Sequence, residues 1–489
     1  MNVICILLDS LNRHFLPVYG NHWVRTPNID ALAARSLIFE QNYIGSAPCM
    51  PARRDLWTGT WEFLWRPWGS LEPWDQPLPR LLRQAGVLTH LITDHYHLFE
   101  RGGENYHIDF EGWEFIRGHE NDPWVTDPAP EKPPFYGVLT DRYWRNMTRM
   151  RREADFLAPR TLQAAADWLE RNHQRDNFFL MIDEFDPHEP FHVPPPYDTM
   201  YDPDWDGPLY FWDRYGRTDE EPETHMRHIR AQYAGKVTMT DRWLGRVLER
   251  IDDFGLWDNT AIILMTDHGH FLGEHGWMGK PTCPAYQTIA HTPLLIHLPG
   301  SQRAGERIDA LTTTVDLYPT ILEWFGVEPP PHIHGRSLVP LLEGKVDRVR
   351  DYVLYGWWGQ SVNYADGTYT YLRHPQSPDN TPLEAYSLRW STAPWWEYPD
   401  LTGRVDYGRF MPQTEMLVGR MAFQPEDMAR LSADPARVVR PSMLFNIRED
   451  EAQEHDLAGT PLEEDYAERL RRALYDVQAP ESQFRRLGL

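Results

Sequence analysis

The chain has 489 residues, which is enough for one large domain with a smaller partner. Asp and Glu total 72 against 48 Lys and Arg, and the formal charge of −24 argues against a nucleic-acid or anionic-membrane partner. No apolar run approaches the ~20 residues that span a bilayer. An anionic substrate would therefore need a locally positive pocket.

The number of cysteines and the N-terminal residues indicate the cellular compartment. The three cysteines, Cys5, Cys49 and Cys283, are too few for a disulfide framework, and their odd number leaves at least one thiol free. Met1 is followed almost directly by an apolar run, without the basic segment and cleavage site of a signal peptide. We therefore expect a cytoplasmic protein that binds neither membrane nor nucleic acid. The sequence leaves open whether the protein forms a homo-oligomer.

Continuous apolar runs predict the strands of a parallel sheet that is buried on both faces. In chain order, these runs cover residues 3–8, 37–39, 87–93, 177–185, 259–266 and 293–298. Helices are predicted between them at 26–33, with Thr26 as N-cap, and at 77–86, 160–172 and 226–250. The alternation of strands and helices indicates an α/β fold with a mostly parallel central sheet flanked by helices.

The remaining stretches are less regular. Residues 101–159 lack periodicity and are expected to form loops that cover a pocket. The end of the chain, 346–489, is predicted as a smaller α+β domain, with antiparallel strands at 352–355 and 367–372 and a terminal helix around 463–475. Within it, 374–441 is expected to reach over the pocket and to help select the substrate. The larger domain would then be 1–345.

Four of the predicted strands end in acidic or histidine residues. These ends carry Asp9; Asp94 with His95 and His97; His188; and Asp267 with His268. Because parallel strands share one carboxyl edge, these side chains are expected to converge. Each alone is more commonly a helix cap or a satisfied core histidine, but their joint recurrence favours a site.

Two aspartates and a histidine from this edge suit one divalent cation. Carboxylates favour Ca²⁺, Mg²⁺ or Mn²⁺, and a histidine nitrogen shifts the preference towards Mn²⁺, Fe²⁺ or Zn²⁺. Ca²⁺ and Mn²⁺ are the favoured ions, with Mg²⁺, Fe²⁺ and Zn²⁺ left open. Such an ion would polarise a sulfuryl or phosphoryl oxygen and activate a hydroxyl group bound to it.

The stretch from Cys49 to Arg53 has the form Cys-x-Pro-x-Arg and precedes helix-forming residues. Cys49 would lie near a helix N-terminus, where free N–H groups favour a polarised group. The alternative for a lone cysteine is an inert core residue, which the neighbouring proline and arginines disfavour. Arg53, Lys280 and the histidines would bind an anionic ester and supply protons.

These residues resemble the formylglycine-dependent sulfatases of the alkaline phosphatase superfamily, which include the related phosphonate monoester hydrolases. The resemblance runs through most of the chain as an ordered series of motifs around Cys49 to Arg53. They lie at 26–30, 95–97, 186–190, 266–269, 273–280, 315–320 and 335–338. The resemblance implies an alkaline-phosphatase-like core and a metal-dependent sulfatase.

The resemblance also implies the metal site and the nucleophile. Cys49 would be oxidised to formylglycine by a formylglycine-generating enzyme and then hydrated to a geminal diol. One diol oxygen would attack the sulfur of a small-molecule sulfate ester, and loss of the other hydroxyl's proton would release sulfate. Asp9, Asp267 and His268 would hold the metal together with residue 49.

Other roles follow from the same resemblance. Arg53 would steady the diol and His97 would be the base for release of sulfate. Lys280 with His188 would hold the anion and protonate the leaving group. His95 and His291 occupy positions where the family often has a lysine and an arginine, and are assigned to substrate binding.

Several departures from the family pattern leave alternatives open. Asp9 is followed by Ser10 where a second ligand is common, and Thr60 replaces an arginine that often closes the maturation signal. The pair Asp267 and His268 is also similar to the phosphonate monoester hydrolases. One alternative is therefore a phosphonate or phosphate ester hydrolase with the same nucleophile. Another is a binding protein that kept the fold and lost catalysis.

Tryptophans gather just after the Cys-x-Pro-x-Arg motif. They are Trp57, Trp61, Trp65, Trp68 and Trp74. Such side chains stack on a sugar or aryl ring, or equally well fill a core.

Overall fold

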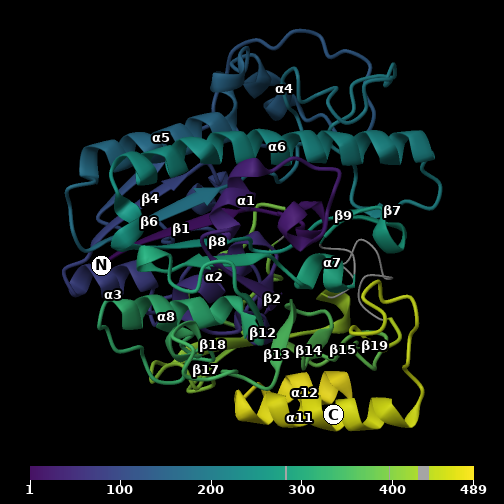
Figure 1. The fold of residues 1–489 in the computed structure, drawn as a ribbon. Helices are drawn as coiled ribbons and strands as arrows, with labels where there is room; N and C mark the ends of the chain where they lie inside the picture. Colours follow the sequence, from purple (N-terminus) through teal and green to yellow (C-terminus); the bar gives the residue numbers. More distant parts are fainter. Residues whose placement is uncertain (281–283, 396, 428–439) are drawn as a thin grey trace.

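The computed structural model describes residues 1–280, 284–395, 397–427 and 440–489. Cys283 and part of the 374–441 segment lie outside them. At the centre is an eight-stranded sheet in the order β12-β2-β11-β8-β1-β6-β4-β5 (Figure 1). Within the described residues, β11 is the one strand of this sheet that runs against the others. The predicted mostly parallel sheet is confirmed.

The strands of this sheet match the predicted apolar runs closely. Their bounds are β1 Asn2–Leu8, β2 Leu37–Tyr43, β4 Leu88–Thr93, β5 Gly112–Phe115, β6 Phe178–Glu184, β8 Thr260–Met265, β11 Leu294–His297 and β12 Arg307–Thr313. The two edge strands are not among the predicted runs: β5 lies in the segment expected to form loops, and β12 is partly exposed and carries no continuous apolar run.

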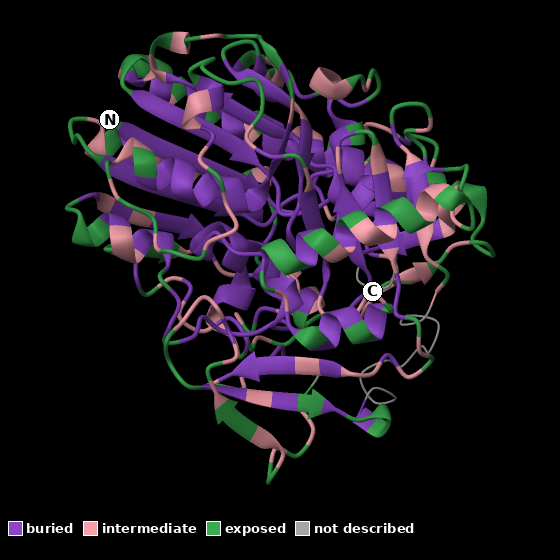
Figure 2. Cartoon of the chain, turned by 90° about the horizontal axis from the view of Figure 1, so that it is seen from below, coloured by how far each residue is buried: buried purple, intermediate pink, exposed green. Residues whose placement is uncertain are grey.

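Helices cover both faces of the sheet, which explains the unbroken apolar runs. Ile4 and Ile6 of β1 pack into one core, whereas Val3 and Leu7 pack into another. In Figure 1, α5 and α6 lie along one face, and α2, α3 and α8 lie below the other. Figure 2 shows most strands of the sheet buried along their length.

The helices bear out most of the sequence prediction and add α4, α7, α8, α9 and α12. Their bounds are α1 Pro27–Ala33, α2 Cys49–Thr58, α3 Leu78–Gln84, α4 Asp141–Met147, α5 Leu157–Asn172, α6 Glu223–Asp253, α7 Gln287–Ala290, α8 Leu317–Trp324, α9 Val339–Leu342, α11 Pro461–Asp476 and α12 Glu481–Leu487. Within the described residues, no helix combines the length and the apolar character that crossing a membrane requires.

The C-terminal part is built on a second, smaller sheet in the order β19-β15-β14-β13-β3, with α11 and α12 beside it (Figure 1). Its strands are β3 Ser46–Ala47, β13 Val353–Trp357, β14 Val362–Ala365, β15 Tyr369–Arg373 and β19 Met443–Asn446. The pairings among β13, β14, β15 and β19 are antiparallel, which confirms the predicted C-terminal sheet.

Two three-stranded sheets complete the fold. One has the order β16-β18-β17 and the other the order β7-β10-β9. Their strands are β7 Gly216–Arg217, β9 Phe271–Leu272, β10 Trp277–Gly279, β16 Leu383–Ser387, β17 Val405–Gly408 and β18 Val418–Phe423.

The two parts of the chain are joined next to Cys49. β3 lies just before Cys49 and pairs in parallel with β13, through Ser46 with Gly356 and Ala47 with Trp357. The C-terminal sheet therefore begins with a strand from the N-terminal part. The division at residue 345 stays a prediction.

Candidate active site

The carboxyl edge of the large sheet holds the predicted cluster. β8, β1, β6 and β4 are consecutive and parallel, so their polar ends lie side by side. Cys49, the first residue of α2, faces this edge. One ligand atom from each of Asp9, Cys49, Asp267 and His268 lies within 4.8 Å of the others, and all four residues are buried.

The donor set of this cluster fits a divalent cation. Nδ1 of His268 lies 2.9 Å from the carbonyl oxygen of Gly269, which only accepts, so Nδ1 carries the proton. Burial lowers the pKa of His268 to about 4, and the ring is neutral at neutral pH. Its Nε2 lone pair is left facing the cluster, 3.3 Å from Sγ of Cys49. A neutral imidazole with two carboxylates is a suitable ligand set.

Arg53 is surrounded by carboxylates. Its Nη1 lies 3.0 Å from Oδ2 of Asp9 and 2.8 Å from Oδ2 of Asp267. Its Nη2 lies 2.6 Å from Oδ1 of Asp183 on β6. One guanidinium thus faces three buried carboxylates, and burial and the charge of Asp267 raise the pKa of Asp9 well above its usual range. A cation would offset the excess negative charge.

Ser10 orients the carboxylates. Its backbone N–H donates to Oδ1 of Asp267 at 3.0 Å, and its hydroxyl donates to Oδ1 of Asp9 at 2.8 Å. The same hydroxyl accepts from Nζ of Lys280 at 2.9 Å. Ser10 holds a left-handed φ of 62°, which few non-glycine residues adopt and which often marks functional sites. Its contacts link Lys280 to both aspartates.

The predicted histidines at strand ends lie around this cluster with different charge states. Burial lowers the pKa of His95 and His188 well below the usual value, so both are neutral. Nε2 of His95 lies 3.7 Å from Oδ2 of Asp9. Nδ1 of His188 donates to the carbonyl oxygen of Glu189 at 2.7 Å, which leaves its Nε2 lone pair free. His97 differs, because carboxylates flank its ring.

His291 lies apart from these residues. Its Nε2 contacts Nη1 of Arg13 and the carbonyl oxygen of Glu40, each at 2.5 Å. Its ring stacks on Tyr43 with 5.2 Å between centroids. The contacts of His291 fix the strand edge near β2, so its assignment to substrate binding gains no support from the geometry.

The tryptophan group divides between core and site. Trp57, Trp61 and Trp65 are fully buried core residues, and Trp74 is also buried. Trp68 instead packs edge-on against His97, with centroids 5.1 Å apart, and against Trp395 at 4.9 Å. Trp395 is 60% exposed and belongs to the segment expected to reach over the pocket. Segment 374–441 therefore contacts the site at His97, because the ring centroids of Trp395 and His97 lie 5.4 Å apart.

Sequence reasoning missed three acids of the site: Asp183, Glu189 and Glu120. Asp183 lies inside the predicted strand 177–185, where an acid within an apolar run is itself a signal of a buried partner. Glu189 lies in the motif at 186–190 and is 3.8 Å from Nζ of Lys280. Glu120 lies in the aperiodic segment, where nothing in the sequence singles it out.

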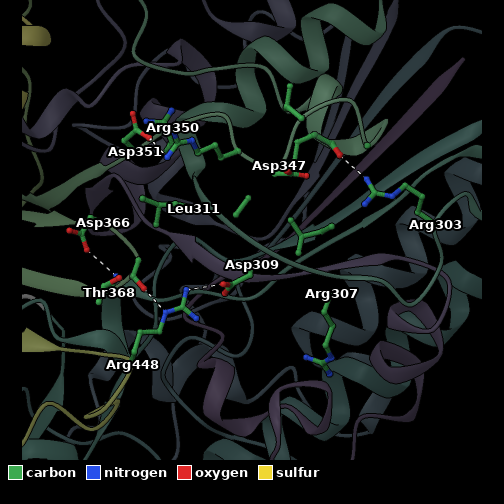
Figure 3. A pocket seen from close by; sticks show the side chains of 17 residues that line it. Arg303, Arg307, Asp309, Leu311, Asp347, Arg350, Asp351, Asp366, Thr368 and Arg448 are labelled. Carbon is green, nitrogen blue, oxygen red and sulfur yellow. Dashed lines mark hydrogen bonds and ion pairs between the residues drawn. The ribbon is translucent and has the colours of Figure 1, made fainter.

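A separate pocket of about 590 Å³ lies between β12 and the C-terminal sheet (Figure 3). Its arginines are paired with acids: Arg448 lies 2.9 Å from Asp309, and Arg303 lies 2.6 Å from Glu306. The pocket therefore offers little free positive charge to an anion and is distinct from the Cys49 cluster.

The chain is similar in sequence to known enzymes. The sequence model of the sulfatase family matches residues 1–327. A multifunctional alkaline phosphatase superfamily protein from Trinickia caryophylli is 29% identical over 433 residues, covering 74% of this chain and 81% of that protein. An arylsulfatase from Clostridium perfringens is 25% identical, and the match covers 72% of this chain and 80% of that protein.

Solved structures share the fold. The phosphonate monoester hydrolase of Agrobacterium radiobacter superimposes with a TM-score of 0.69 at 20% identity, covering 98% of this chain and 95% of its own. The phosphonate monoester hydrolase of Silicibacter pomeroyi superimposes with a TM-score of 0.66 at 22% identity, covering 97% of this chain and 94% of its own. The chain therefore belongs to the sulfatase family, sulfuric ester hydrolases of the alkaline phosphatase superfamily.

Proposed function

We propose that the protein hydrolyses a small-molecule sulfate monoester with a formylglycine made from Cys49 and one divalent metal ion. The observation that carries this proposal is the position of Cys49: the first residue of α2, buried, with its ligand atom within 4.8 Å of those of Asp9, Asp267 and His268. A formylglycine-generating enzyme is the implied maturation partner.

The environment of Cys49 favours a precursor over a thiolate nucleophile. Burial and the charge of Asp9 raise the pKa of the thiol well above its usual value, so the reactive thiolate is scarce at neutral pH. Hydrated formylglycine would supply the attacking hydroxyl, and the metal held by Asp9, Asp267 and His268 would acidify it and polarise the ester.

The chain's own residues have distinct proposed tasks. Arg53 holds Asp9 and Asp267 in place, and its Nη1 also donates to the carbonyl oxygen of Cys49 at 3.2 Å. Lys280 supplies positive charge for the sulfate group, because its carboxylate neighbours raise its pKa despite burial. His188 lies beside it as a partner in binding and in proton transfer to the leaving group. His97 accepts the proton whose loss releases sulfate.

Intact-mass analysis of the peptide that contains residue 49 tests maturation directly. Protein purified from its native host should show the aldehyde. An unmodified thiol, together with no hydrolysis in the presence of any divalent metal, would instead support the binding-protein alternative.

Phosphonate or phosphate ester hydrolysis is the second candidate. It is favoured by the Asp267 and His268 pair and by the two phosphonate monoester hydrolases that share the fold. Rates on 4-nitrophenyl sulfate and on a 4-nitrophenyl phenylphosphonate should be compared on the same matured enzyme. We expect the sulfate to give the larger kcat/KM, and a dominant phosphonate activity would reverse the ranking.

Replacing Asp9 by alanine should remove most of the bound metal and of the activity while the fold is retained. The change removes a proposed metal ligand but no apolar packing contact. Metal content by mass spectrometry is the measurement, with Asp30→Ala as control, since Asp30 lies on α1 away from the cluster. Unchanged metal content in the Asp9 variant would remove this aspartate from the ligand set.

A further inference from the structure

His97 lies between two carboxylates that the family roles above do not include. Its Nδ1 contacts Oε1 of Glu100, three residues further along the chain. Its Nε2 lies 3.4 Å from Oε2 of Glu120. The three side chains are mostly buried, with 5%, 22% and 13% of their surfaces exposed respectively. Both ring nitrogens of His97 therefore face an acid.

The ring of His97 is also confined on its sides. Trp68, Trp395 and Phe185 pack against it with centroid distances of 5.1, 5.4 and 5.8 Å. This packing opposes a flip of the imidazole that would exchange Nδ1 and Nε2. Glu100 thus fixes the Nδ1 proton, and Nε2 is the atom that gains or loses a proton.

Glu120 shows two further signs of a functional residue. Its φ of 44° is left-handed, a strained conformation for glutamate that neighbouring structure must maintain. Its Oε2 is buried and has no hydrogen-bond partner among the described residues. One of its ligand-type atoms lies within 4.8 Å of those of His188 and Glu189, so the carboxylate lies inside the site.

We propose that Glu120 and Glu100 are positioning residues that hold His97 in one orientation and stabilise its protonated ring. This inference rests on the proposed function, in which Nε2 of His97 accepts a proton from the hydroxyl group of residue 49. Glu100 orients the ring for this transfer. Glu120 stabilises the positive charge that the ring acquires.

The electrostatics of the pocket agree with this arrangement. Burial alone lowers the pKa of His97, but its contact with Glu100 and the negative charges of Glu100 and Glu120 outweigh burial and raise the pKa above the usual value. The other titratable neighbours are His95, which is neutral, and Tyr96, whose pKa is raised by burial and by Glu120. His97 is thus the group that titrates.

The protonation state of His97 sets the direction in which activity changes with pH. A protonated His97 cannot accept a proton, so kcat/KM should rise with pH as His97 deprotonates. Glu120→Gln removes a charge that favours protonation, and the acidic limb of the profile should move about one pH unit lower. Glu100→Gln should also lower that limb and reduce kcat more than KM, because the ring loses its orienting partner.

The experiment measures kcat/KM for 4-nitrophenyl sulfate from acid to alkaline pH with the matured enzyme. Glu114→Gln is the matched control, since Glu114 is exposed on β5 and carries the same charge. The inference predicts a shifted acidic limb in Glu120→Gln and none in the control. An unmoved acidic limb, or a shift of the alkaline limb instead, overturns it.

A second readout does not depend on turnover. NMR titration of histidine-labelled protein, with the His97 signal assigned by its loss in His97→Asn, should show a lower pKa for His97 in Glu120→Gln. If the wild type hydrolyses neither ester, the proposed function fails, and this titration still tests the positioning roles. An unchanged His97 titration in a folded variant overturns them.

Discussion

Replacing Cys49 by alanine should reduce sulfate ester hydrolysis by at least about 10⁴-fold, because the change removes the side chain proposed to become the nucleophile. Cys49 is buried at the start of α2, and alanine is compatible with a helix, so the fold should persist. The measurement is kcat/KM on 4-nitrophenyl sulfate, with circular dichroism to verify folding.

Cys5→Ala is the control for this variant. Cys5 is the other cysteine within the described residues and is buried in β1, in a core rather than at the site. This change should cost some stability and leave kcat nearly unaltered. A Cys49→Ala enzyme with near-normal turnover would contradict a nucleophile at residue 49.

Replacing Arg53 by methionine should both destabilise the protein and abolish activity. Asp9, Asp183 and Asp267 would lose their common cationic partner, and breaking a buried ion pair costs on the order of 3–5 kcal/mol. Denaturant unfolding with and without divalent metal is the measurement. The loss should be larger without metal, because a bound cation compensates two of these carboxylates.

Arg54→Met serves as the matched control for this second variant. Arg54 is the next residue of α2 and is equally buried, but its guanidinium donates to the carbonyl oxygens of Gly69, Arg66 and Pro67. It should lose stability without a metal-dependent component. Equal metal dependence in both variants would contradict the role of Arg53 at the metal ligands.

The sequence allowed the centre of the site to be predicted because its residues follow regular elements. Asp9 and Asp267 come directly after unbroken apolar runs, and parallel strands bring such positions to one edge. The same reasoning identified His95 and His97 after β4. Position along a strand was therefore enough for side chains at strand ends.

Interactions between distant side chains could not be predicted in this way. Thr26 was expected to cap α1, but its hydroxyl makes no capping bond; Asp241 of α6 accepts from the backbone N–H of Ile29 at 2.7 Å instead. Glu120 reaches His97 from an irregular segment whose path depends on tertiary packing. Both contacts join residues that only the tertiary fold brings together, so no local sequence pattern predicts them.

The pairing of β3 with β13 has a consequence for how the protein is made. The strand immediately before Cys49 is completed only by residues 356–357, so the segment that contains Cys49 cannot reach its final register until those residues have been synthesised. The proposed formylglycine-generating enzyme would have this interval of translation in which to act on residue 49. A chain truncated after residue 345 would lack that strand partner, and expressing the N-terminal part alone should not yield an active enzyme.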